Sequence, residues 1–364
     1  MQNDRVIKSR NVSLDLLRIL SMLMIVVLHV NSHGGVLNNV SYFNVTIARL
    51  FESFSLPAVN IFVLISGYFL VDSRFKLSKI LKLVLQVWFY SWIICVILFI
   101  TGWGSFAAKD VISIAFPISY KEYWFITAYL LMYIMSPVLN ILINSLSRNQ
   151  HKFLMISLLV ITSVWHDLVP ASDPLFIHNG YSYFWFVVLY LIGAYIKRYN
   201  PKIDRPLFGY LLCCLLMFVS MMVLHTIVNK HAIFEAYLPI DHFSKYCSIL
   251  NVVSSVSLFC FFKDHTVDHG KIYSHIASYI FGIYLIHDNI HFRDLIWGKL
   301  FGLSVTDRFI ILHAAIAVVC TFVVCLFIDY LRYILFSILF KDAFWVRLDK
   351  WFYSKMDKIG VKLN

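Results

Sequence analysis

The chain has 364 residues, of which 60% are hydrophobic and only 14% are charged. A soluble domain of this length does not have so apolar a composition, and no polar stretch is long enough to form a separate soluble domain. A net charge of +11 would suit nucleic acid, but the lysines and arginines lie in short loops between apolar runs. That distribution excludes a nucleic-acid partner and is typical of a multi-pass protein of the lipid bilayer.

Most of the apolar runs approach the length of about 20 residues that crosses the hydrocarbon core. We therefore predict an all-α integral membrane protein in which residues 1–340 form a bundle of about ten transmembrane helices. Lysine and arginine concentrate in the N-terminal segment and in every second loop after it, so the positive-inside rule predicts cytoplasmic N- and C-termini. The predicted spans are 13–31, 55–72, 77–101, 123–144, 153–168, 181–197, 206–228, 245–263, 274–291 and 309–340.

The first run, LDLLRILSMLMIVVLHV, contains Asp15, Arg18 and His29 at membrane depth. Ionisable groups are costly there, so they indicate a functional site by default. At about 100° per residue, the eleven steps from Arg18 to His29 return both side chains to within about 20° of each other, about 16 Å apart along the axis. Asp15 lies about 60° from Arg18 on the same stripe. The competing interpretation is an arginine that snorkels to one interface and a polar histidine near the other.

This stripe suits a long ligand that is anionic at one end and reactive at the other. A neutral imidazole at His29 can take a proton from a hydroxyl group while that oxygen attacks an acyl carbonyl. Arg18 can hold phosphate, and Asp15 can orient the guanidinium. These residue types predict an acyl thioester of a phosphorylated carrier as the ligand.

Polar residues in later runs are further candidates for a pocket. Asn60 and Ser66 lie in the second run, although serine and glycine there also permit close helix packing. Glu122 precedes Trp124 at the outer edge of another run, a pairing typical either of a sugar-binding surface or of an ordinary aromatic belt. Arg74 follows the second run, where it can contact phosphates or simply obey the orientation rule.

The ninth run, SHIASYIFGIYLIHDNIH, contributes Tyr284 and His287 as pocket candidates. His287 and His291 have the spacing of two metal ligands on one helix, but no further ligand set accompanies them, so we predict no metal site. Residues 341–364 alternate aromatic and basic side chains at helical spacing. They predict a basic amphipathic helix on the anionic inner leaflet.

Asp15, Arg18 and His29 resemble the first-helix signature of the acyltransferase family 3 membrane proteins. The blocks NIFVLISGYFL, EYWFITAYLLMYIMSPVLN and FGIYLIHDN resemble later segments of that family, in the same order and over nearly the whole chain. The resemblance implies a ten-helix enzyme of the bacterial inner membrane that O-acylates surface polysaccharides such as O-antigen, enterobacterial common antigen or exopolysaccharide. It also implies acetyl-CoA as donor substrate, with no bound cofactor, and a glycan or lipid-linked glycan as acceptor.

The resemblance assigns catalysis to His29 and donor handling to Arg18. A donor-phosphate role for Arg74 follows only in part, because many family members have several arginines at that point and this chain has one. The alternative function is a polytopic transporter or flippase of a glycan or small anionic solute, since intramembrane charges are also typical of transporters. Against it, the charges cluster on one helix and no inverted repeat is apparent.

Overall fold

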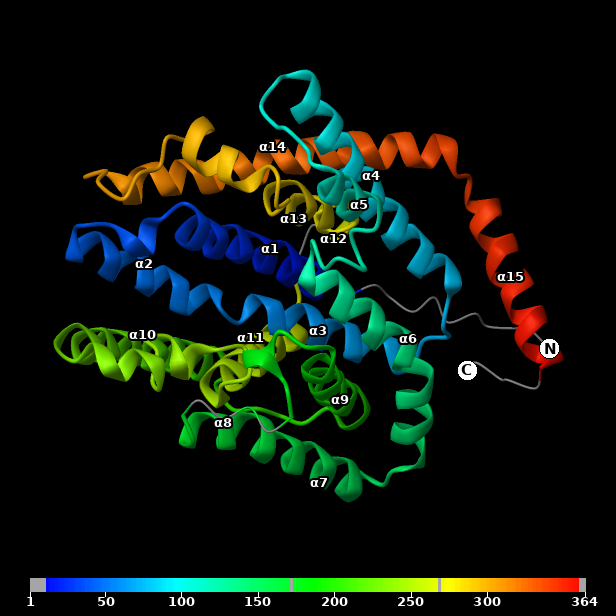
Figure 1. The fold of residues 1–364 in the computed structure, drawn as a ribbon. Coiled ribbons are helices and arrows are strands. Elements are labelled where there is room, and N and C mark those ends of the chain that lie inside the picture. The colour runs from blue at the N-terminus through cyan, green and yellow to red at the C-terminus, as the bar shows by residue number, and fades with distance from the viewer. Residues whose placement is uncertain (1–10, 171–172, 174, 268–269, 360–364) are drawn as a thin grey trace.

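The computed structural model describes residues 11–170, 173, 175–267 and 270–359, and this part of the chain contains helices and no strand. Most of the long helices run side by side as one bundle (Figure 1). The helices are α1 (Val12–His33), α2 (Tyr42–Ser55), α3 (Ala58–Leu70), α4 (Leu77–Ile100), α5 (Ala108–Ala115), α6 (Trp124–Ser145), α7 (Arg148–Leu159), α8 (Trp165–Leu168), α9 (Tyr183–Tyr199), α10 (Pro206–Lys230), α11 (Ile249–Asp264), α12 (Gly270–Ile276), α13 (Phe281–His287), α14 (Ile310–Leu339) and α15 (Asp342–Lys358).

Seven helical segments in the described residues are long and apolar enough to cross a membrane. They are α1, the α2–α3 pair, α4, α6, α10, His242–Asp264 and α14. The predicted spans 153–168, 181–197 and 274–291 also coincide with helices, but α9 has only 17 residues and α12 and α13 are separate short helices. The chain is thus a multi-pass helical membrane protein, while the count of ten and the cytoplasmic termini remain predictions.

The predicted span 55–72 coincides with α3, and the apolar helical segment that contains it begins earlier, at Tyr42 of α2. α2 carries the polar residues Asn44, Arg49 and Glu52, which made this stretch read as a loop in the sequence. The chain bends between α2 and α3 at Pro57, whose missing N–H cannot continue the α2 hydrogen-bond pattern.

Helix α1 lies at the centre of the bundle and packs against α2, α3, α11, α12, α13 and α14. Its first turn is capped by Asn11, whose side chain accepts a hydrogen bond from the Leu14 backbone N–H at 3.1 Å. Because α1 is surrounded by other helices, its polar face meets protein rather than lipid. A position inside the bundle agrees with the sequence-based prediction that the polar side chains of α1 form a functional site.

Helix α3, which packs against α1, also packs closely against α9. A Cβ atom added at Gly67 would lie 2.4 Å from the Tyr190 carbonyl oxygen, and one added at Gly193 would lie 2.4 Å from the Leu64 carbonyl oxygen. Only glycine therefore permits this backbone approach, which is the usual role of small residues in membrane helices. The packing interpretation of the glycine in the SGYFL block is confirmed.

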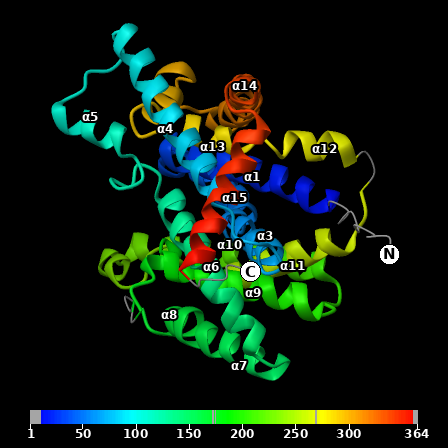
Figure 2. The ribbon, with the colours of Figure 1, turned by 90° about the vertical axis from the view of Figure 1, so that its right-hand side faces the viewer.

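Helix α15 runs across one end of the bundle from the end of α14 toward α6, as the turned view shows (Figure 2). It packs against α4 and buries Trp345, while the Phe352 ring lies 5.8 Å from Phe75. A helix at 342–358 agrees with the predicted amphipathic tail, whose last residues, 360–364, lie outside the described residues, as do residues 1–10 of the predicted 1–340 domain. Its position on the membrane surface remains a prediction.

Candidate active site

A cavity of about 390 Å³ lies between α1, α2, α3, α6, α13 and the segment that precedes α11. His29 contributes to its wall from the second half of α1 and is 18% exposed there. Tyr284 of α13 and Trp124 of α6 contribute to the same wall. Three of the residues singled out in the sequence therefore meet at one cavity, although they come from helices far apart in the chain.

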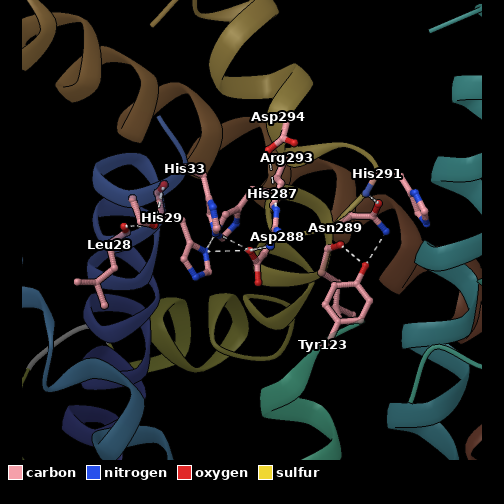
Figure 3. Close-up of polar contacts among 12 residues, drawn as sticks. Leu28, His29, His33, Tyr123, His287, Asp288, Asn289, His291, Arg293 and Asp294 are labelled. Carbon is pink, nitrogen blue, oxygen red and sulfur yellow. Dashed lines mark hydrogen bonds and ion pairs between the residues drawn. The ribbon is translucent and has the colours of Figure 1, made fainter. Parts of the chain in front are cut away.

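The His29 ring is held by a second histidine from α13 (Figure 3). His29 Nδ1 lies 2.8 Å from His287 Nε2, and His287 Nδ1 lies 2.6 Å from the Ile283 carbonyl oxygen. That carbonyl can only accept, so His287 Nδ1 carries a proton and its neutral ring accepts at Nε2. His29 then donates from Nδ1, which leaves the lone pair of its Nε2 free to take a proton from a substrate.

Asp288 follows His287 and brings a carboxylate to the same place. Its Oδ1 lies 3.7 Å from His29 Nδ1, 3.5 Å from His33 Nε2 and 3.7 Å from Arg293 Nη1. A carboxylate at this distance stabilises a positive charge on the His29 ring once that ring is protonated. The cluster thus contains a candidate base, His29, a histidine that orients its ring, His287, and a carboxylate that can balance its positive charge, Asp288.

Two contacts fix α13 so that His287 faces α1. On one side, Tyr123 donates to the Leu285 carbonyl oxygen at 2.8 Å and accepts from Asn289 Nδ2 at 2.9 Å. On the other side, Gly282 lies directly against Asp329 of α14, where a built-in Cβ would be 2.1 Å from the carboxylate carbon. The short helix is therefore clamped between α6 and α14.

Asp329 belongs to a buried ion pair within α14. Arg332 donates to it from Nε at 2.7 Å and from Nη2 at 2.9 Å, and the Tyr90 hydroxyl donates at 2.7 Å. The Gly282 N–H donates to the same carboxylate at 3.3 Å. This network was not predicted from the sequence, although two charges three residues apart in an apolar run are a visible signal.

Arg18 and Asp15 lie at the other end of α1, outside the cavity. Arg18 Nη1 contacts Asp15 Oδ1 at 2.6 Å, and Ser274 donates to Asp15 Oδ2 at 2.7 Å. The guanidinium also lies 5.4 Å from the centre of the Phe69 ring. The predicted orientation of Arg18 by Asp15 is present, but the structure does not bring Arg18 and His29 into one pocket.

Arg74 lies in a separate, open groove formed with α15. Its guanidinium lies 3.7 Å from the centre of the Tyr353 ring, and Lys350 and Lys358 line the same groove. The groove is basic and faces the end of the bundle on which α15 lies. It is not continuous with the His29 cavity in the described residues.

Three other predicted pocket residues lie outside the cavity. Asn60 is fully buried, donates to the Tyr246 carbonyl oxygen at 2.8 Å and accepts from Trp185 Nε1 at 3.1 Å. Ser66 bonds to the Phe62 carbonyl oxygen within its own helix at 2.9 Å. These contacts give Asn60 and Ser66 structural roles in joining and shaping helices.

Glu122 is also outside the cavity and is almost fully buried. It accepts from the Ser91 hydroxyl at 3.0 Å and the Ser113 hydroxyl at 2.9 Å, and His291 Nε2 lies 3.5 Å from its carboxylate. Glu122 thus joins α4, α5 and the segment after α13. The predicted sugar contact of Glu122 is not supported by this position, whereas Trp124 does reach the cavity.

The cavity also contains residues that were not predicted from the sequence. Tyr181 and Tyr246 form an aromatic wall with the predicted Trp124, with ring centres 4.5 Å apart for Trp124–Tyr181 and 4.9 Å apart for Tyr181–Tyr246. Beside it lie Glu52 and the Asp241–Lys245 ion pair, whose atoms are 2.5 Å apart. Only the tertiary fold brings Glu52, Tyr181, Tyr246 and the Asp241–Lys245 pair to the His29 helix, so no local pattern could have found them.

Apolar helices surround a cavity, and the His29 ring presents there a nitrogen that can accept a proton. These features are typical of a multi-pass membrane enzyme that catalyses group transfer. A family model for the acyltransferase domain matches residues 11–330, nearly the whole chain. The chain therefore belongs to acyltransferase family 3 and is a membrane acyltransferase. No curated protein and no solved structure matched it significantly.

Proposed function

We propose that this protein is an O-acetyltransferase of the bacterial inner membrane. It moves the acetyl group of cytoplasmic acetyl-CoA to a sugar hydroxyl of a surface polysaccharide or of its lipid-linked precursor. The observation that carries this proposal is the His29–His287–Ile283 chain, because it leaves an unprotonated His29 Nε2 at a cavity. Membership of the family supports acyl transfer, and the donor and acceptor are inferred.

In the proposed reaction His29 acts as general base. Its Nε2 takes the proton of the sugar hydroxyl while the oxygen attacks the thioester carbonyl carbon, and a tetrahedral oxyanion forms. The C–S bond then breaks, the ester remains on the sugar, and the CoA thiolate takes the proton from the imidazolium. His287 keeps the ring in the reactive tautomer, and Asp288 stabilises the transient imidazolium.

We assign donor binding to the opposite end of α1. Arg18, oriented by Asp15, and Arg74 in its basic groove are suited to the phosphates of CoA. Arg18 and His29 are separated by about 16 Å along the helix, so the extended arm of the donor would connect the two ends. CoA is a substrate in this scheme, and the chemistry requires no bound cofactor.

The acceptor would occupy the His29 cavity. The aromatic wall of Trp124, Tyr181 and Tyr246 offers apolar faces for a sugar ring, and Tyr284 lies next to it. Hydroxyl groups of the ring can donate to the carboxylate of Glu52, which lines the same cavity. A cavity of about 390 Å³ is within the usual range for small-molecule sites.

The test is mass spectrometry of the surface glycans of the host, combined with CoA release by the purified protein. Deletion of the gene and His29→Ala should both remove about one acetyl mass per repeat, because each change removes the proposed base. His313→Gln, at an exposed histidine away from the cavity, is the matched control and should leave the glycan unchanged. Normal acetylation in His29→Ala would refute the base assignment. An unchanged repeat mass with altered glycan export would favour the transporter.

A further inference from the structure

Glu52 of α2 lines the cavity, and its Oε2 atom is buried without a hydrogen-bond partner in the described part of the chain. The aspartate, lysine and arginine side chains of the same wall lie close to opposite charges. Lys245 is 2.5 Å from Asp241, and Arg293 is 3.7 Å from Asp288. Buried carboxylates are normally hydrogen-bonded, and a charge at membrane depth is costly. An unsatisfied carboxylate beside a cavity therefore indicates a ligand that donates to it.

A purely structural role would require a partner for Glu52 within the bundle. Arg49 lies three residues earlier on α2, a spacing that allows an ion pair on one helix face. Arg49 is only 8% exposed, yet its Nε also has no hydrogen-bond partner in the described residues. Arg49 Nε and Glu52 Oε2 therefore do not bond to each other, and the carboxylate keeps its capacity to accept.

Glu52 and His29 lie at nearly the same depth in the bundle. α1 and α2 pack side by side and run in opposite directions (Figure 1). Asn31 Nδ2 of α1 donates to the Ala48 carbonyl oxygen of α2 at 3.0 Å. His29 precedes Asn31 by two residues, and Glu52 follows Ala48 by four. At about 1.5 Å per residue, the two side chains are offset by only about 3 Å along the helix axes, so one sugar ring in the cavity can reach both.

We propose that Glu52 binds a second hydroxyl group of the acceptor sugar and thereby selects the hydroxyl that is acetylated. This second hydroxyl donates to the carboxylate while the ring lies against the aromatic wall, and another hydroxyl then faces His29 Nε2. The acceptor is accordingly a sugar unit with at least two free hydroxyl groups. Selection by Glu52 rests on the proposed function, because it needs an acceptor in the cavity and His29 as its base.

The kinetic test uses the purified protein in lipid nanodiscs, acetyl-CoA, and the unacetylated glycan isolated from a host strain that lacks the gene. Glu52→Gln removes the charge and keeps the size of the side chain. It should raise the acceptor KM at least tenfold and change the donor KM less than twofold, because a hydrogen bond to a charged group is lost. Glu235→Gln, the same change at an exposed position away from the cavity, is the matched control and should change neither KM.

The position of the new ester provides a second measurement. NMR spectroscopy of the product should find the acetyl group at one hydroxyl with the wild-type protein and at two or more hydroxyls with Glu52→Gln. An unchanged acceptor KM or an unchanged single position would overturn the proposal. A structural carboxylate predicts a different result, namely a lower stability of Glu52→Gln in micelles with the same acceptor KM and the same product.

Acceptor binding is also measured without acetyl-CoA, from the change in tryptophan fluorescence as the unacetylated glycan is added, since Trp124 lies in the cavity wall. Glu52→Gln should weaken this binding at least tenfold. If His29→Ala acetylates normally, the function proposed for His29 is wrong, although weaker binding in Glu52→Gln would still place the sugar at Glu52. If transfer depends on His29 while binding and position do not depend on Glu52, the selection is wrong and the acyltransferase proposal stands.

Discussion

The buried ion pair of α14 provides a quantitative test of how the site is held. Asp329 is fully buried and Arg332 is only 9% exposed, so the change Asp329→Asn leaves a buried guanidinium without a counter-charge. Breaking a buried pair in this way costs about 3–5 kcal/mol. Because Asp329 also contacts the first turn of α13 at Gly282, the loss should loosen the helix that carries His287.

Equilibrium unfolding in detergent micelles would measure this loss, with acetyl transfer measured in parallel. Adding Arg332→Gln to Asp329→Asn removes the unpaired charge, and we expect the double variant to recover more than half of the lost free energy. A loss below about 1 kcal/mol in Asp329→Asn, or no recovery in the double variant, would contradict the argument that the pair matters through its buried charge.

Other consequences can be checked with single substitutions. His287→Leu removes the acceptor for His29 Nδ1 and should lower kcat by about 10–100-fold with little change in donor KM; an unchanged kcat would mean that the ring is oriented by another group. Gly193→Ala places a methyl group against α3 and should destabilise the fold by about 1–3 kcal/mol, measured by unfolding in micelles, whereas full stability would show that α3 and α9 separate freely. A cysteine at Ser105 should react with an impermeant thiol reagent on intact cells and one at Lys202 should not; the reverse pattern would invert the predicted topology.

The sequence predicted the helix that carries His29 and several of the side chains that surround it. Polar residues in apolar runs marked His29, His287 and Tyr284, because a charge or imidazole at membrane depth has few purposes. Helical periodicity placed Arg18 and His29 on one face but said nothing of what packs between them. Phe69 lies against the Arg18 guanidinium, and the cavity ends before reaching it.

The candidate residues that lie outside the cavity have one feature in common. Asn60 was a candidate as a polar residue in an apolar run and Glu122 as a carboxylate beside aromatic residues, and both are hydrogen-bonded to partners from other helices. Whether a polar residue faces a cavity or a partner depends on tertiary contacts, which one sequence does not show. The same limit hid Tyr246 and Tyr181, which reach the cavity only through the tertiary fold.

The contact between His29 and His287 joins residues 258 positions apart in the chain. At a synthesis rate of about 5–20 residues per second, His29 leaves the ribosome about 13–50 s before its partner. During that interval α1 is already a candidate for membrane insertion, but His29 has neither the histidine at its Nδ1 nor the neighbouring carboxylate. If His29 acts as the proposed base, the newly made protein stays inactive until its last third has been inserted, and a truncated chain that reaches the membrane would not modify a substrate.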